Sequence, residues 1–286
     1  MIPFANGLRL LQAAKGVCAG RESFTGTEEF RPDTDTGERV AHRNTVISIF
    51  IVVALGACSD GSRGPLDLGE PILSGTETFI DFEEFADGDT VTSSQGVPIS
   101  LLRRGRRCAD AITALDSGVP HGSGEDDLDL SSPNETFGGL GQGAGGERGR
   151  KYENGTPLGN VLIIQEDPAV RDDHPGPGDN CADGGLIGFD FTALSPTGVA
   201  VKSIILMDVD NRKEADRIEI RLYGPAGQLL LSKRPPVTGS NGVVNLKLGP
   251  TQGVTRLEVD QGGGAPIAMD TIDFVVPEPT EPDSTG

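Results

Sequence analysis

A group of carboxylates in a glycine- and serine-rich loop is the strongest chemical signal in the sequence. Asp126, Asp127 and Asp129 follow a predicted strand, and Asp116 lies just before the loop. Hard cations such as calcium take several oxygen ligands, and a loop can wrap around a cation where a strand cannot. The spacing is not that of an EF-hand, because the sixth position counted from Asp127 is Ser132 and not glycine. The loop is a candidate calcium site, with solvated surface carboxylates as the alternative.

Other motifs that suggest chemistry are not supported by the residues around them. The segment Gly141–Gly146 has the glycine spacing of a dinucleotide-binding loop, but an acidic loop precedes it and no helical pattern follows. No Gly-x-Ser-x-Gly elbow occurs. The two histidines of the body, His121 and His174, give little support for a catalytic triad or a zinc site. We therefore expect no enzyme. Pairs of carboxylates can hydrolyse glycosides, so a hydrolase acting on polysaccharide stays open as an alternative.

The elements that must position these residues are short strands. From Thr76 onward, runs of β-type residues alternate with glycine, proline, asparagine and aspartate, and no run shows a capped helix. This pattern predicts an all-β fold over residues 76–276, an antiparallel β-sandwich or jelly roll of about ten strands. The segment 117–159 is long for a loop inside a domain, so it is either functional or tied down. The expected strands are 79–83, 97–101, 111–115, 161–164, 186–191, 199–207, 217–223, 228–231, 243–248, 254–259 and 269–275.

The charge of the chain limits its partners. Lysine and arginine total 24 and aspartate and glutamate 43, which gives a net charge of −19. A phosphate backbone requires a basic face, so nucleic acid is not an expected partner. An anionic membrane surface is disfavoured for the same reason.

An apolar run with a basic flank precedes the β-rich body. Residues 45–57 are apolar enough for a signal peptide and too few for a comfortable membrane span. The end of the run, Leu55-Gly56-Ala57-Cys58, resembles the lipobox of bacterial lipoproteins, which implies acylation of Cys58. We expect a signal peptide over 40–57, a flexible tether over 58–75 and a disordered tail over 277–286. Residues 1–39 are then disordered or not translated, with the true start at Val40. An internal strand or an uncleaved anchor is the alternative.

The interpretation of the leader assigns a role to each of the four cysteines. Cys18 is lost with the leader and Cys58 carries lipid, which leaves Cys108 and Cys181 in the exported body. An even pair in an oxidising compartment predicts a disulfide.

Short motifs spread over the body carry a further signal, at 114–117, Pro120, 125–130, 133–134, 145–147, 158–166, 184–185 and 207–210. Together they resemble a largely uncharacterised module of exported bacterial proteins, similar in pattern to galactose-binding-like jelly rolls. Such jelly rolls hold a structural calcium between an early strand and the last one. The resemblance therefore implies calcium ligands among Asp81, Glu83, Asp270 and Asp273.

The expected function is a surface binding or adhesion module, anchored by lipid to the outer membrane or cell surface. A glycan or another envelope polymer is the expected partner, and the membrane is contacted only through the lipid. Only Tyr152 and Tyr223 offer aromatic rings with a polar tip, which weakens the case for sugar stacking. A purely structural envelope protein is the main alternative. A cleft with two facing carboxylates would favour the hydrolase. The sequons at Asn134 and Asn154 are expected to have no meaning in a bacterium.

Overall fold

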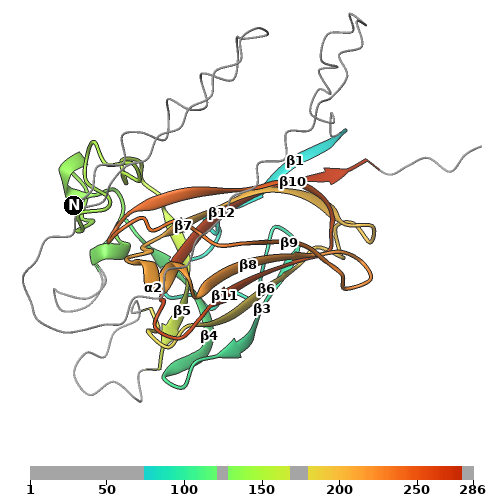
Figure 1. Ribbon diagram of the computed structural model, residues 1–286, viewed down its shortest axis with the longest axis horizontal. Coiled ribbons are helices and arrows are strands. Elements are labelled where there is room, and N and C mark those ends of the chain that lie inside the picture. Colours follow the sequence, from blue (N-terminus) through green and yellow to red (C-terminus); the bar gives the residue numbers. More distant parts are fainter. Residues whose placement is uncertain (1–73, 121–127, 168–179, 279–286) are drawn as a thin grey trace, which may run out of the picture. The chain divides into compact units, whose positions relative to one another are not determined.

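Two antiparallel β-sheets face each other across the hydrophobic core (Figure 1). The computed structural model describes residues 74–120, 128–167 and 180–278. Those residues form twelve strands in two six-stranded sheets. The predicted antiparallel β-sandwich is therefore confirmed. The expected leader, Cys58 and almost all of the expected tether lie outside the described residues, as does most of the expected tail. Within the described part of the chain, no helix is long and apolar enough to cross a membrane.

The first sheet joins the two ends of the body. Its strand order is β10-β7-β12-β5-β4, and β1 pairs antiparallel with β12, so the first and last strands are neighbours, as expected. Its strands are β1 (Gly75–Ile80), β4 (Cys108–Asp116), β5 (Asn160–Glu166), β7 (Val199–Met207), β10 (Val243–Val254) and β12 (Ala268–Pro277).

The second sheet has the order β2-β3-β6-β11-β8-β9. Its alternation is clearest in β8, where Ile218, Ile220 and Leu222 are fully buried while Glu219 and Arg221 face outward. This period-two pattern places one face on the core and leaves the other for polar side chains. The strands of this sheet are β2 (Ser93–Ser94), β3 (Val97–Arg104), β6 (Gly185–Asp190), β8 (Ile218–Tyr223), β9 (Leu229–Lys233) and β11 (Arg256–Gln261).

Three strand and helix predictions need correction. The first strand ends at Ile80 and not at Glu83, because Phe82 takes a left-handed backbone conformation (φ 61°) that breaks the extended chain. β10 continues to Val254 through register shifts around Thr251, six residues beyond its expected end. A one-turn helix, α2 (Arg212–Ala215), was missed. Its N-cap is Asn211, whose side chain accepts hydrogen bonds from the first turn.

The predicted disulfide is confirmed. Cys108 and Cys181 are bonded, with their Cα atoms 5.3 Å apart, and both residues are buried. The bond joins the start of β4 to the segment before β6, where the Cys181 N–H donates to the Ile164 carbonyl of β5. It spans a sequence separation of 73 residues.

Candidate functional site

An acidic pocket of about 650 Å³ lies between the end of β1 and the beginning of β12. Asp81 and Glu83 enter it from the bend after β1, and Asp270 enters it from β12. Glu153 and Thr156, from the chain before β5, line another part of its wall. The structure thus brings together three of the four carboxylates that the resemblance implied. We call this cavity the acidic pocket.

The bend after β1 is held by local hydrogen bonds. The left-handed conformation of buried Phe82 turns the chain, and the Glu83 carboxylate accepts a hydrogen bond from the Asn160 backbone N–H at 2.7 Å. The Asn160 side chain in turn donates to the backbone oxygens of Phe82 and Phe85. Gly159 lies at φ 69°, and a Cβ atom there would collide with the Glu83 carboxylate. The start of β5 therefore fixes the orientation of Glu83.

Asp270 is the unusual group of the pocket. Asp270 is only 3% exposed. Its Oδ1 atom is buried and has no hydrogen-bond partner among the described residues. Burial raises the pKa of Asp270 to about 7, and the negative charges of Glu83 and Asp81 add to that effect. Hydrogen bonds from Thr271 oppose it only in part. A buried carboxylate with a free oxygen beside two other carboxylates is unfavourable unless a proton or a cation joins it.

The other expected calcium ligands lie elsewhere. The Asp273 carboxylate accepts a hydrogen bond from the Ser203 hydroxyl at 2.8 Å and does not line the acidic pocket. Asp126 and Asp127 lie outside the described residues. Asp129 does not line the acidic pocket, and its negative charge contributes instead to the raised pKa of Asp208. In the described part of the chain, no three histidine, cysteine, aspartate or glutamate side chains already stand in the arrangement of a metal centre.

A buried asparagine network ties down the long segment, which the sequence left open as functional or restrained. Asn134, Asn154 and Asn241 are at most 1% exposed. The Asn241 side-chain amide donates to the backbone oxygens of Asp129 (2.8 Å) and Ser131 (2.7 Å). Its side-chain oxygen accepts from Asn134 (2.8 Å) and Asn154 (3.2 Å). The two sequons thus mark structural amides. The sequence did not indicate this role for Asn134 and Asn154, because their partner Asn241 lies over 80 residues further along the chain.

The glycines of Gly141–Gly146 serve the same network. Gly145 donates its N–H to the Ser240 carbonyl at 2.9 Å, and Gly143 accepts from Asn134. A Cβ atom on Gly143 would collide with the Ser240 backbone, and a Cβ atom on Gly145 would collide with the Gly239 backbone. The glycines are therefore needed for close contact between two chain segments, in keeping with the rejection of a nucleotide loop.

A second group of carboxylates surrounds the end of β7. Asp208 is 5% exposed and left-handed (φ 72°), and its Oδ1 accepts the Asn241 N–H at 2.9 Å. Burial raises the pKa of Asp208 well above its usual value, and the charges of Asp129 and Asp210 raise it further. Asp216, at the C-terminal end of α2, pairs with Arg212 on the surface.

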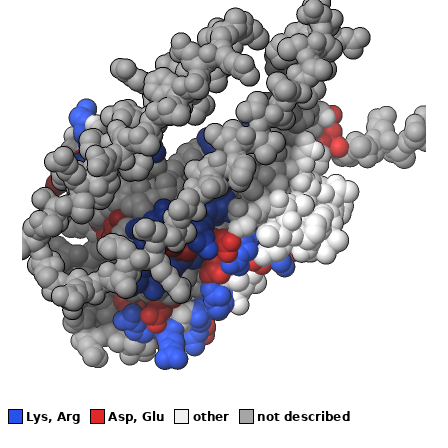
Figure 2. Space-filling view, in the orientation of Figure 1, with Lys and Arg blue, Asp and Glu red and all other residues white. Residues whose placement is uncertain are grey.

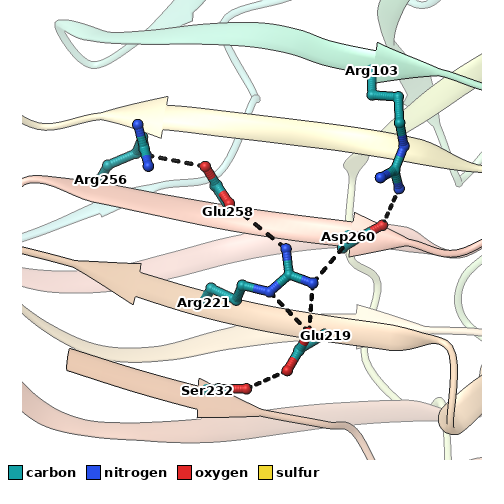
Figure 3. A network of polar contacts seen from close by, with 7 residues as sticks. All are labelled: Arg103, Glu219, Arg221, Ser232, Arg256, Glu258 and Asp260. Atoms are coloured by element: carbon teal, nitrogen blue, oxygen red, sulfur yellow. Dashed lines mark hydrogen bonds and ion pairs between the residues drawn. The ribbon is translucent and has the colours of Figure 1, made fainter. Parts of the chain in front are cut away.

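The outward face of the second sheet carries a continuous ion-pair network (Figure 3). Arg221 pairs with Glu219 and Asp260, and Asp260 also pairs with Arg103. Arg256 pairs with Glu258 at 3.1 Å. Glu258 and Asp260 are buried to 7% and 9% exposure on this outward face, because the arginines cover them. Figure 2 shows the result, a band of intermingled basic and acidic side chains over the region of β3, β8 and β11.

Comparison with known proteins leaves the family open. No family model matches the chain, and no curated protein matches it. A mutant of the lectin binding domain of lectinolysin, solved in complex with Lewis b, matches with 12% identity and a TM-score of 0.25; the match covers 32% of this chain and 66%, just under two thirds, of that chain. A DUF4465 family protein from Bacteroides caccae matches with 9% identity and a TM-score of 0.35, over 70% of this chain and 99% of that chain. At this similarity neither match assigns a ligand to this protein.

Proposed function

We propose that this protein is an exported binding module of the cell envelope, that a calcium ion in the acidic pocket stabilises it, and that its ligand is a glycan or a similar envelope polymer. The observation that carries the calcium assignment is Asp270, whose buried Oδ1 atom has no hydrogen-bond partner in the part of the chain that the structure describes, while Asp81 and Glu83 share its pocket. The lipobox-like Cys58 and the disulfide support export, because disulfides persist in oxidising compartments.

The donor set of the pocket suits a hard cation. Asp81, Glu83 and Asp270 offer only oxygen atoms, and calcium takes six to eight oxygen ligands, with backbone carbonyls and waters completing the set. The Asp81, Glu83 and Asp270 carboxylates repel one another, and a divalent cation reverses that repulsion. Asp81 follows the strand that pairs with β12, where Asp270 lies, so one ion would join the first and last strands of the body.

Calcium binding is tested by thermal unfolding of metal-stripped full chain in calcium and in chelator. We expect calcium to raise the melting temperature and chelator to lower it, because a ligand that binds only the folded state stabilises it by mass action. Asp270→Asn should abolish the response, while Asp216→Asn, a surface carboxylate paired with Arg212, should leave it intact. Identical melting curves of wild-type protein in calcium and chelator would refute the calcium site. A glycan array probed in both conditions tests the ligand class.

A polysaccharide hydrolase is the second candidate, and the observation that favours it is the group of carboxylates in the acidic pocket. The pKa of about 7 at Asp270 would keep that carboxyl protonated near neutral pH, as a general acid requires, while Asp81 or Glu83 would serve as the second carboxylate. The two candidates differ in their response to calcium, because a bound cation would hold Asp270 in its charged form and remove the acid. Release of reducing ends from envelope polysaccharide in chelator, lost in Asp270→Asn, would favour the hydrolase.

A further inference from the structure

A row of three side chains crosses the end of the second sheet on its outward face. Arg256, at the start of β11, lies directly opposite Asp190 at the end of β6 on one side. It lies directly opposite Tyr223 at the end of β8 on the other side. Side chains opposite one another in an antiparallel pair share a face and have Cβ atoms about 5 Å apart. We call Asp190, Arg256 and Tyr223 the end row.

The end row differs from the rows beside it in how its charges are paired. The neighbouring row places Glu258 opposite Arg221, and the next places Asp260 opposite Glu219, and all of these charges belong to the ion-pair network. Asp190 and Arg256 have opposite charges and lie directly opposite each other, yet in the described structure they form no ion pair with each other. Of these three rows, the end row is therefore the one in which opposite charges face each other without forming an ion pair.

Each charged group of the end row is held away from the other by its own neighbours. Arg256 forms an ion pair through Nε with Glu258 (Figure 3), and its guanidinium carbon lies 4.5 Å from the centre of the Tyr223 ring. Asp190 Oδ1 accepts from both the backbone N–H and the hydroxyl of Thr192, at 2.9 and 2.6 Å. Among the described residues, the Nη nitrogens of Arg256 and the Oδ2 oxygen of Asp190 therefore remain able to bind a ligand.

A recess of about 170 Å³ lies between these groups. The end row lines it together with Thr192, Thr255 and the turn Gly224–Gly227. The turn is closed by the Gly227 N–H donating to the Gly224 carbonyl, and Thr255 is bonded to the Tyr223 carbonyl. At about 30 Å³ for each water molecule, the recess holds roughly six waters, which is the space of one small ring and not of an oligomer.

We propose that this recess binds a single neutral saccharide unit, at a site separate from the acidic pocket and independent of calcium. A sugar hydroxyl both donates and accepts, so adjacent hydroxyls would accept from the Arg256 guanidinium and donate to the Asp190 carboxylate. An anion would be repelled by Asp190 and a cation by Arg256, whereas a polyol satisfies both. Tyr223, whose ring carries the Arg256 guanidinium, forms part of the wall of the recess and lies next to the bound sugar. The inference rests on the proposed glycan-binding function and names the site.

The chain provides its own fluorescent reporter for the test. It contains no tryptophan and two tyrosines, so in a Tyr152→Phe background Tyr223 is the sole tyrosine. The full chain in that background is titrated with the methyl glycosides of galactose, glucose, mannose and fucose, in chelator, while tyrosine emission is followed. We expect a saturable change in emission with at least one glycoside.

Matched variants decide whether the recess is responsible. Asp190→Asn keeps an acceptor for Thr192 but replaces the Oδ2 acceptor with an uncharged NH2 donor, and Arg256→Lys keeps the charge and removes the planar guanidinium. Each should weaken binding at least tenfold, while Arg103→Lys, the same change two rows away, should leave the affinity as it is. Wild-type affinity in either Asp190→Asn or Arg256→Lys overturns the inference, as does an absence of saturable response to all four glycosides. A failure of the calcium site would appear only in the melting experiment, so the two proposals are tested separately.

Discussion

Asn241 donates its backbone N–H to Asp208 Oδ1 at 2.9 Å, and both residues have left-handed backbones, at φ 63° and 72°. The hydrogen bond joins the end of β7 to the approach to β10, and the Asn241 side chain carries the connection on to the long segment before β5. A buried carboxylate is thus placed next to the amide network that organises the loop. The contact explains why an aspartate is tolerated at a position only 5% exposed, since its charged form has at least one backbone donor.

Asp208→Asn should stabilise the protein at neutral pH. Burial raises the folded-state pKa of Asp208, so from its ordinary value of 3.8 upward the unfolded state releases its proton before the folded state does. This carboxyl therefore destabilises the fold increasingly as the pH rises through that range. An asparagine oxygen can still accept the Asn241 N–H, but it carries no charge. Urea unfolding at pH 8 should show a higher midpoint for the variant, and a lower midpoint would contradict the assignment.

Asp270 should make stability fall between about pH 4 and pH 7 when calcium is removed. Its folded-state pKa is raised from 3.8 to about 7, so the destabilisation begins as the unfolded state ionises and is complete above pH 7. The full difference corresponds to about 4 kcal/mol. Asp270→Asn should flatten this part of the pH profile in chelator. A wild-type profile with the same slope as the variant would show that Asp270 is ionised normally.

Asn241→Ala should destabilise the fold severely. The change removes the acceptor of the buried Asn134 and Asn154 side chains. It also removes a donor to the carbonyls of Ser131, which is buried, and of Asp129, which is partly exposed. Each buried polar group left unpaired costs about 1–3 kcal/mol, so we expect a loss of at least about 3 kcal/mol in the free energy of unfolding. Alanine is also less tolerant than asparagine of the left-handed backbone at this position. Ser232→Ala, on the solvent-facing side of β9, is the control and should change stability little.

Removing the disulfide by Cys108→Ala together with Cys181→Ala should lower the free energy of unfolding by about 4 kcal/mol, because the bond closes a loop with a separation of 73 residues. The reduced wild-type protein should unfold at nearly the same denaturant concentration as the double variant. Free thiols at both positions in protein taken from the envelope would show that the bond does not form there.

Cys58→Ala should abolish lipid attachment. The small residues before Cys58 predict cleavage and acylation there, so wild-type protein should incorporate a labelled fatty acid during growth and the variant should not. Cys18→Ala is the matched control and should be labelled as the wild type is. Equal labelling of wild type and Cys58→Ala would exclude the lipid anchor.

The sequence by itself determined the local pattern of the body. Strict alternation over residues 217–223 predicted a strand, and Ile218, Ile220 and Leu222 are indeed its buried face. Cysteine counting found the Cys108–Cys181 pair, because the interpretation of the leader left no other partners. The strand at Phe82 was predicted too long, since its alternation of apolar and acidic residues gave no sign of a left-handed turn.

Only the tertiary structure decided which distant residues meet. Asp81 and Asp270 share a pocket because β1 pairs with β12, Asn134 reaches Asn241 across 107 positions, and the end row forms because β11 lies between β6 and β8. Side-chain alternation is a property of one strand and can be read within it. The register between strands distant in sequence depends instead on how all the apolar faces pack into one core, and a one-residue slip would reverse every side chain. The site residues depend on that register, so the sequence named some of them and could not assemble them.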